Sequence, residues 1–496
     1  MRYYLGIDIG TFESKGCLVD ETGNIVTSAA MPHKMIVPQA GWAEHRAEED
    51  WWGDFTFICK KLITESKVDP TYIKAVATSG IGPCMLPVDK HGTPLMNAIL
   101  YGVDTRAAVE IEELNAEIGT EQILDFCGNA LTSQSVGPKI LWLKKNRPDL
   151  FAKTHKILNC NSYLNFKLTN RYVIDHYSAS SSAPLYDPAK LRWSDDLTKD
   201  IITLDKLPDC GWSTDIAGHV TAKASLETGL AAGTPVTFGT IDAAAEAFSV
   251  GVLSPGDMMM MYGSTIFIIA LTKGRVRDAR LWYAPWLFPN QHASMAGLAT
   301  SGTLTHWFRD NMAKELDVAT AAPTLTKEAM SSPPGANGLI TLPYFSGERT
   351  PIYDTAAKGM IFGLNLTHTR ADMFRSVLEG IAYGTHHVLR TFDEVGEEPQ
   401  NIFAVGGGTK NKLWSQATSD VSGKTQTLRE KSIGASYGNA FLAAMAVGDV
   451  KSDDINKWNP VTTKIEPQPQ TVIIYAKQYE IFRELYERNK DLMHAL

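Results

Sequence analysis

Leu5-Gly-Ile-Asp-Ile-Gly-Thr11 and Met260-Met-Tyr-Gly-Ser-Thr265 are two stretches of the same design. Each is an apolar run that ends in a glycine turn with hydroxyl groups and is followed by another apolar run. This pattern predicts a hairpin whose tip can hold an anion, because glycine lets backbone N–H groups approach a phosphate closely. The first stretch adds Asp8, whose carboxylate would repel a phosphate, so we expect Asp8 to face a metal ion or a metal-bound water. Taken singly, each tip is more simply explained as a turn between strands.

The length and composition describe a globular protein with several domains. At 496 residues the chain is too long for one core, and two to four domains are expected. Hydrophobic residues make up 44% and charged residues 21%, which is ordinary for a folded protein. The net charge is −8 and no cluster of Lys and Arg is present, so a small-molecule partner is expected rather than a nucleic acid.

The cysteines and the apolar runs bear on the compartment. The six cysteines show no C-x-x-C spacing, which argues for a reducing compartment and against a structural zinc site. The first residues lead directly into a predicted strand, without the pattern of a signal peptide. No apolar run approaches the length of a membrane span. We therefore expect a cytoplasmic protein with no membrane partner.

Two polar stretches follow apolar runs in the first half. The loop Ser79-Gly-Ile-Gly-Pro83 comes after a predicted buried strand over 73–78, a position where binding residues are often held. Asp104 and Arg106 end another apolar run, before a helix expected to begin near Ala107. Asp104 and Arg106 either pair with each other or hydrogen-bond a polyol, and the residues alone favour neither reading.

Asp242 lies between a predicted strand over 235–239 and an alanine-rich helix. One reading is structural, because Asp is a favoured N-cap residue. The other is catalytic, because the positive end of the helix dipole keeps a carboxylate ionised and able to accept a proton. The local sequence does not separate the two.

The second half contains a further glycine turn. Gly406-Gly-Gly-Thr409 follows a predicted strand and precedes a helix expected near Asn411, an arrangement that suits an anion or a nucleotide. It matches the dinucleotide fingerprint only partly, because Asn411 replaces the third glycine, and a dehydrogenase is kept as a weaker hypothesis. Residues 258–261 are methionines that we interpret as core filler, and residues 434–448 predict a small-residue helix suited to close packing.

Together, the two hairpins and the Gly406 turn resemble the nucleotide-contacting elements of the superfamily of sugar kinases, actin and heat-shock chaperone ATPases. The more specific resemblance is to the FGGY carbohydrate kinases. The stretch Gly359-Met-Ile-Phe-Gly-Leu364, with Asp372 and Ser376-Val-Leu-Glu379 at the following spacings, fits the second signature of that family. The first signature is matched around residues 139–143, but Val136 and Gln134 depart from it.

This resemblance implies an α/β fold with two ribonuclease H-like domains and an interdomain cleft. It implies a sugar-binding side over 1–248, an ATP-binding side over 249–450, and a C-terminal helical tail over 451–496 that packs on the domains. It also implies ATP and Mg²⁺ as cofactors. A homodimer is a possible assembly.

The resemblance also implies roles for individual residues. Asp242 matches the general base that deprotonates the attacking sugar hydroxyl, and Asp8 would hold Mg²⁺ through water. The ATP-binding residues would be Gly10, Thr11, Gly263, Ser264, Thr265, Gly406 and Gly407. The substrate-binding residues would be Ile81, Gly82, Asp104, Arg106 and Asp242.

The implied substrate is a pentulose such as xylulose or ribulose, since the chain looks most like xylulokinase-like pentulose kinases. Those kinases carry a Gln-Met-His run where this chain has Ile81-Gly82-Pro83, and many relatives carry a tryptophan where it has Gly102. Alternative acceptors are another polyol or a sugar acid, such as erythritol, glycerol or gluconate. A competing class is a non-catalytic actin-like or sugar-sensing ATP-binding protein.

Overall fold

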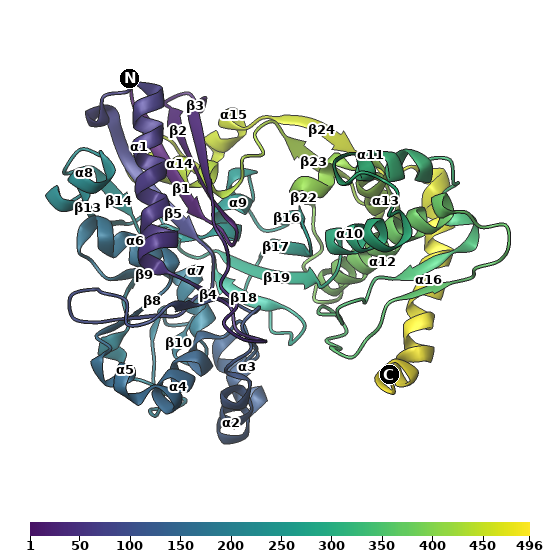
Figure 1. Ribbon diagram of the computed structural model, residues 1–496, viewed down its shortest axis with the longest axis horizontal. Coiled ribbons are helices and arrows are strands. Elements are labelled where there is room, and N and C mark those ends of the chain that lie inside the picture. Colours follow the sequence, from purple (N-terminus) through teal and green to yellow (C-terminus); the bar gives the residue numbers. More distant parts are fainter. The chain divides into compact units, whose positions relative to one another are not determined.

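The computed structural model describes residues 1–496, which divide into two compact units (Figure 1). Unit 1 comprises Met1–Leu253, Gly274–Ala293 and Ile433–Pro460, and unit 2 comprises Ser254–Lys273, Ser294–Ser432 and Val461–Leu496. The chain thus passes between the units several times, whereas the predicted ranges 1–248, 249–450 and 451–496 are consecutive. The assignment of a sugar side, an ATP side and a tail to those ranges stays a prediction.

Unit 1 is built on a mixed sheet that brings polar residues to one edge. The strands are β1 (Tyr3–Ile9), β2 (Glu13–Asp20), β3 (Ile25–Pro32), β5 (Ile73–Gly80), β13 (Ile216–His219), β14 (Pro235–Thr237) and β15 (Thr240–Ile241). Their order is β13-β14-β5-β1-β2-β3, with β15 also paired to β5. Strands β1, β5 and β15 run parallel, and the register sets Asp8 opposite Ser79 and Ser79 opposite Thr240. Their carboxyl ends therefore meet at one edge of the sheet.

Helices cover this sheet closely. Helix α14 (Ala435–Ala446) packs directly on β1 because Gly6 has no side chain: a Cβ there would lie 1.9 Å from the carbonyl oxygen of Ser436. The close packing expected for residues 434–448 is therefore confirmed. The other helices of unit 1 are α1 (Asp54–Ser66), α2 (Ala108–Ile118), α3 (Thr120–Cys127), α4 (Val136–Asn146), α5 (Pro148–Lys153), α6 (Cys160–Thr169), α7 (His176–Ala179), α8 (Ala222–Thr228), α9 (Asp242–Ser249) and α15 (Ile455–Trp458).

Short strands complete unit 1. They are β4 (Glu44–His45), β6 (Leu86–Val88), β7 (Ala98–Ile99), β8 (Lys156–Leu158), β9 (Val173–Asp175), β10 (Tyr186–Asp187), β11 (Arg192–Trp193), β12 (Asp209–Gly211) and β18 (Trp282–Pro285). The pairing of β4 with β7 sets Glu44 opposite Ile99, close to where the run before Asp104 ends.

Unit 2 repeats the central arrangement of unit 1. Strands β16 (Asp257–Tyr262) and β17 (Ile266–Thr272) form an antiparallel hairpin, and β16 runs parallel to β22 (Asn401–Val405), as β1 does to β5. The sheet continues with β19 (His292–Leu298), β23 (Gln426–Arg429) and β24 (Val461–Ile465). Met258, Met259 and Met260 are buried in β16, so their interpretation as core residues is confirmed, whereas Met261 is only half-buried.

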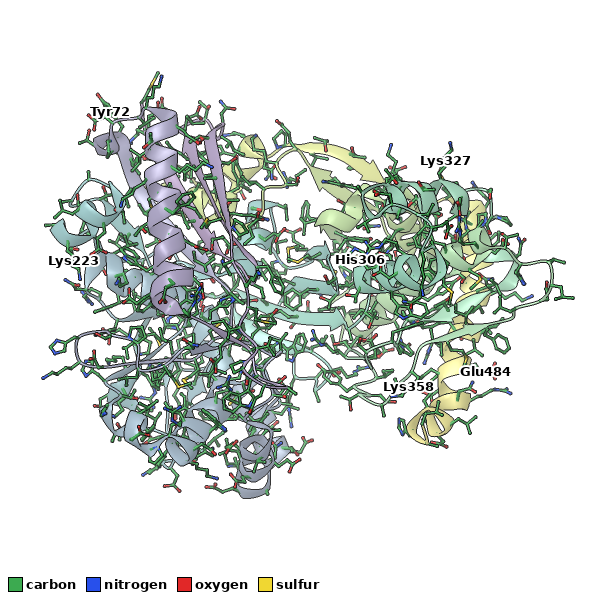
Figure 2. All side chains as sticks on the ribbon, in the orientation of Figure 1. Tyr72, Lys223, His306, Lys327, Lys358 and Glu484 are labelled. Carbon is green, nitrogen blue, oxygen red and sulfur yellow. The ribbon has the colours of Figure 1, made fainter.

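The helices of unit 2 are α10 (Gly302–Met312), α11 (Val318–Ala329), α12 (Arg370–Glu394), α13 (Lys412–Ser422) and α16 (Pro469–His494), and a small sheet pairs β20 (Ile340–Leu342) with β21 (Met360–Phe362). Helix α16 buries an aromatic face that includes Tyr475 and Phe482 against Tyr383 of α12. Glu484 projects from its exposed side (Figure 2). None of the helices combines the length and apolarity that crossing a membrane requires.

Candidate active site

The tip of the first hairpin has its carbonyl groups tied back by two histidines. The Nε2 atom of His33 donates to the carbonyl oxygen of Gly10 at 3.0 Å, and the Nε2 atom of His45 donates to that of Thr11 at 3.1 Å. The backbone N–H of His33 donates to the carbonyl oxygen of Phe12 at 2.9 Å. Three successive carbonyls are held this way, and the N–H groups of Thr11 and Phe12 make no hydrogen bond to a protein acceptor. Such adjacent free amides form an anion-binding concavity.

The pKa values of the two histidines are shifted in opposite directions. His33 donates through both ring nitrogens, because its Nδ1 lies 2.8 Å from a carboxylate oxygen of Asp54. Burial alone would lower the pKa of His33, but the hydrogen bond and the charge of Asp54 outweigh it and raise the pKa. His45 accepts from Trp51 at Nδ1, and burial together with the charge of His33 lowers its pKa to about 4. The two imidazoles that hold the tip therefore differ in proton affinity, which is raised for His33 and lowered for His45.

The tip of the second hairpin is held by the start of helix α10. The backbone N–H of Gly302 donates to the carbonyl oxygen of Gly263, and the N–H groups of Ser301 and Thr303 donate to that of Ser264, over 3.0 to 3.2 Å. A Cβ on Gly302 would lie 2.5 Å from the carbonyl oxygen of Gly263, so this approach needs glycine. The N–H groups of Ser264 and Thr265 are again left without an internal partner, as in the first tip.

The Gly406 turn also depends on its glycines. Gly406 has a φ of 90°, and a Cβ there would lie 2.6 Å from the carbonyl oxygen of Tyr262 in β16. A Cβ on Gly407 would meet nothing within 4 Å, so open space lies beside it. Asn411 caps α13 by accepting from the N–H groups of Leu413 and Trp414. The residue that departs from the dinucleotide fingerprint therefore has a structural role.

Two carboxylates lie at the carboxyl edge of the first sheet. Asp8 is buried in β1, and its Oδ1 accepts a 2.7 Å hydrogen bond from Ser79, while its Oδ2 has no partner. Burial raises the pKa of Asp8 to about 6. Burial and the charge of Asp8 raise the pKa of Asp242 well above its ordinary value. A carboxylate with raised proton affinity is suited to accept a proton from a hydroxyl group.

The N-cap interpretation of Asp242 is wrong in its detail. Helix α9 begins at Asp242 itself and its N-cap residue is Ile241, so the carboxylate lies inside the first turn. Its Oδ1 accepts only from the adjacent N–H of Ala243, at 2.7 Å, and Oδ2 has no partner. Residues at i and i+4 share a helix face, which places Glu246 on the face of Asp242. Burial, followed by the charge of Asp8, raises the pKa of Glu246 to about 7.

The donor set in unit 1 fits a magnesium ion that is also coordinated by phosphate. No three or more His, Cys, Asp and Glu side chains are grouped so that they could hold a metal by themselves. Magnesium keeps several waters and takes one or two carboxylates together with substrate phosphates. The unpartnered Oδ2 of Asp8 is a hard oxygen ligand of the kind this coordination needs.

Asp104 and Arg106 pair with each other in a fully buried cluster. Arg106 donates from Nε and from one terminal nitrogen to the two carboxylate oxygens of Asp104, at 2.9 and 2.7 Å, and from the same terminal nitrogen to Glu44 at 2.9 Å. Its guanidinium lies 3.8 Å from the ring centre of Trp42. The other terminal nitrogen, NH1, is buried with no partner. The pair is therefore a rigid buried unit with one uncommitted donor, and not a surface ion pair.

The loop predicted to hold substrate residues is partly strand and partly core. Strand β5 extends to Gly80, and the backbone N–H of Ile81 donates to the carbonyl oxygen of Ile9 at 2.6 Å. The side chain of Ile81 is buried, and Gly82 packs against Ile241, the residue before Asp242. The loop thus supports both the first hairpin and the start of α9.

Gln134, which departs from the first family signature, lies beside Gly102, which replaces the tryptophan expected from the resemblance. The carboxamide oxygen of Gln134 accepts from the N–H of Gly102 at 3.0 Å, and a Cβ on Gly102 would lie 2.7 Å from the Nε2 of Gln134. Gln134 therefore occupies the space beside position 102, where a larger side chain would not fit.

Several supporting residues are not evident from the sequence. Asp175 accepts from the hydroxyl group of Thr240 at 2.8 Å, two residues before Asp242. The ammonium group of Lys139 donates to the carbonyl oxygens of Leu100 and Tyr101, just before Asp104. The pairings join segments tens of residues apart, and the sequence marks Lys139 only as the start of the stretch 139–143 that resembles the first family signature.

Comparison with known proteins identifies the family. The model of the FGGY family of carbohydrate kinases, N-terminal domain, matches residues 3–249, and that of the C-terminal domain matches residues 258–447. A xylulose kinase of Bacillus subtilis is 28% identical over 100% of this chain and 99% of its own length. A gluconokinase of the same organism is 26% identical, covering 91% of this chain and 89% of its own.

The fold agrees with solved structures. The crystal structure of xylulose kinase from Rhodospirillum rubrum superposes with a TM-score of 0.93 and 30% sequence identity, covering 99% of this chain and 100% of the other. The predicted two-domain α/β sugar-kinase fold and the predicted family are both confirmed. With both domain models matched and the structural agreement extending over the full length, the chain belongs to the FGGY family of carbohydrate kinases.

Proposed function

We propose that this carbohydrate kinase transfers the γ-phosphoryl group of ATP to a free hydroxyl group of a pentulose, with D-xylulose and D-ribulose as the first candidates. The observation that carries the proposal is the Asp242 carboxylate, whose Oδ2 is free and whose proton affinity is raised by burial and by the charge of Asp8. The full-length similarity to xylulose kinases supports the substrate class.

Each part of the chain then has a defined task. Asp242 accepts the proton of the attacking hydroxyl group at Oδ2, because its Oδ1 is committed to the N–H of Ala243. The free N–H groups at Thr11 and Phe12, and at Ser264 and Thr265, bind phosphate oxygens. Phosphoryl transfer depends mainly on such positioning and on charge neutralisation.

The cofactors are assigned to the same groups. Asp8 would hold Mg²⁺, and the ion would supply positive charge that offsets the phosphates. Gly10 allows the first tip to approach the transferred phosphate. Gly406 and Gly407 lie under the nucleotide. A side chain at position 406 would clash with β16, and the space beside position 407 is open.

The sugar is bound by the buried Asp104–Arg106 unit. The uncommitted NH1 of Arg106 is a donor without a protein acceptor, and a substrate oxygen would satisfy it. The backbone of Ile81 and Gly82 forms another wall of the sugar site. Since no imidazole is present in that loop, selectivity between pentuloses would rest on Arg106 and on the carboxamide of Gln134.

A second candidate substrate is a sugar acid such as gluconate, favoured by the similarity to a gluconokinase. The test is ADP release by the purified protein with Mg²⁺ and ATP, using xylulose, ribulose, gluconate, glycerol and erythritol as separate acceptors. A reaction without acceptor measures background ATP hydrolysis. We expect the highest kcat/KM with a pentulose. A higher kcat/KM with gluconate would show that the substrate is a sugar acid instead of a pentulose. If none of the acceptors increases ADP release above the background, the proposal is refuted.

A further inference from the structure

Helix α14 contains a buried asparagine, Asn439, although its many small residues suit the helix to close packing. Asn439 lies in the middle of α14, among alanine and glycine residues, and is fully buried. Its Nδ2 atom donates to the carbonyl oxygen of Ile7 at 2.9 Å and to the hydroxyl oxygen of Ser79 at 2.7 Å. Ser79 is also fully buried, and its hydroxyl group donates to Oδ1 of Asp8 at 2.7 Å. Three side chains from three separate elements therefore form one chain of hydrogen bonds.

The direction of each hydrogen bond in this chain is fixed. The carbonyl oxygen of Ile7 can only accept, so the atom of Asn439 that faces it is the NH₂ group. The second hydrogen of that NH₂ group points to Ser79, whose oxygen must accept it. The single hydrogen of the Ser79 hydroxyl group is then committed to Asp8. If Asn439 did not donate, the Ser79 hydroxyl group could rotate and donate its hydrogen to an acceptor other than Asp8.

The helix that carries Asn439 cannot easily move. A Cβ on Gly6 would lie 1.9 Å from the carbonyl oxygen of Ser436, which shows how closely α14 approaches β1. A Cβ on Gly438 would lie 2.0 Å from the carbonyl oxygen of Ala245, so α14 approaches α9 equally closely. Helix α14 is therefore held against the strand that carries Asp8 and against the helix that begins at Asp242.

We propose that Asn439 and Ser79 are positioning residues that fix the orientation of the Asp8 carboxylate. With Oδ1 held by Ser79, the free oxygen Oδ2 points to one place, where it can receive a metal ion or its bound water. A carboxylate held in one orientation loses less conformational freedom when it binds a metal, and such outer-shell partners typically contribute a factor of about 10 to 100 in metal affinity. This inference rests on the proposed role of Asp8 as the metal-binding residue.

The test measures how strongly Mg²⁺ tightens nucleotide binding, without any catalytic turnover. The dissociation constant of ADP is measured by calorimetry in EDTA and again in saturating Mg²⁺, for the intact chain and for Asn439→Leu and Ser79→Ala. We expect each variant to bind ADP normally in EDTA but to lose about 10-fold in the presence of Mg²⁺. Because the two residues act in series, the double variant should lose no more than the larger single loss.

Two further variants make the outcome decisive. Asn459→Leu is the matched control, because Asn459 is another fully buried asparagine of unit 1, and its Nδ2 donates to the carbonyl oxygen of Ser249. It should lower stability without changing the effect of Mg²⁺. Asp8→Asn should abolish most of the Mg²⁺ effect. If Asp8→Asn does so while Asn439→Leu and Ser79→Ala match the unmodified protein, the positioning role is refuted. If Asp8→Asn has no effect, the metal assignment itself is refuted.

Discussion

Replacing Arg106 with lysine tests whether the buried pairing with Asp104 and Glu44 requires a planar guanidinium group. Arg106 satisfies both oxygens of Asp104 and one of Glu44, and its side chain is fully buried over the ring of Trp42. A lysine ammonium is a single point charge and lacks the planar fork that reaches both carboxylates. Arg106→Lys therefore removes the bidentate contact to Asp104, whose oxygens keep only the backbone N–H donors of Ala43 and of residue 106.

The size of the effect follows from the burial. Removing one partner of a buried ion pair lowers the free energy of unfolding by about 3–5 kcal/mol. Because lysine keeps the positive charge, we expect Arg106→Lys to lie near the lower end of this range, at about 3 kcal/mol. In a unit of about 300 residues, each kcal/mol shifts the melting temperature by about 2 °C, so a decrease of about 6 °C is expected. The KM for the sugar should rise, because NH1 is lost as a donor, while the KM for ATP should stay close to its original value.

The assay is thermal unfolding followed by fluorescence, together with steady-state kinetics of ADP release. Arg171→Lys is the matched control, because Arg171 pairs with Asp209 and both of their side chains are mostly exposed. Exposed pairs contribute up to about 1 kcal/mol, so Arg171→Lys should change neither measurement appreciably. A melting temperature within 1 °C of that of the unmodified protein, with an unchanged sugar KM for Arg106→Lys, would refute the reasoning.

Three further predictions concern other parts of the chain. Burial raises the pKa of Glu348 to about 8, so the unfolded chain releases this proton at lower pH than the folded chain does. The free energy of unfolding should therefore fall as pH rises from about 4.5 to about 8. Glu348→Gln should flatten this slope in melting temperatures measured across that range, and an unchanged slope would contradict the assignment. Gly6→Ala should lower the melting temperature by several degrees because its Cβ would meet the backbone of α14, whereas Gly274→Ala, which has open space, should not; equal effects would disprove the close packing. Gly302→Ala should displace the second hairpin and raise the KM for ATP more than the KM for the sugar in initial-rate measurements, and a selective rise in the sugar KM would count against a nucleotide role.

The two hairpins could be predicted because they follow from local patterns. Apolar runs that end in glycine turns give β1–β2 and β16–β17, and the same turns account for the free amides at Thr11 and Ser264. The sequence of the turns does not predict which residues hydrogen-bond to their carbonyl oxygens. His33 and His45 bind the first tip from the end of β3 and from β4, and neither position has a pattern that marks it.

Other parts of the site depend on tertiary contacts between distant segments. Asp104 and Arg106 were ambiguous because pairing and polyol binding need the same residue types, and only the position of Glu44 and Trp42 shows that the pair is buried. Asn439 escapes prediction because a lone polar residue in a small-residue helix has no signal of its own. Its meaning comes from Ser79, 360 residues earlier in the chain.

The central claim is that Asp242 is the base for phosphorylation of a pentulose, and formation of the phosphorylated sugar tests it most directly. D-xylulose and D-ribulose are each incubated with ATP and Mg²⁺, and the sugar phosphate is quantified by mass spectrometry for the unmodified protein and for Asp242→Asn. The account predicts a pentulose phosphate from the unmodified protein and a rate roughly 10²- to 10⁴-fold lower for Asp242→Asn, with ADP affinity unchanged. A near-normal rate for Asp242→Asn, or no sugar phosphate from either pentulose, would contradict it.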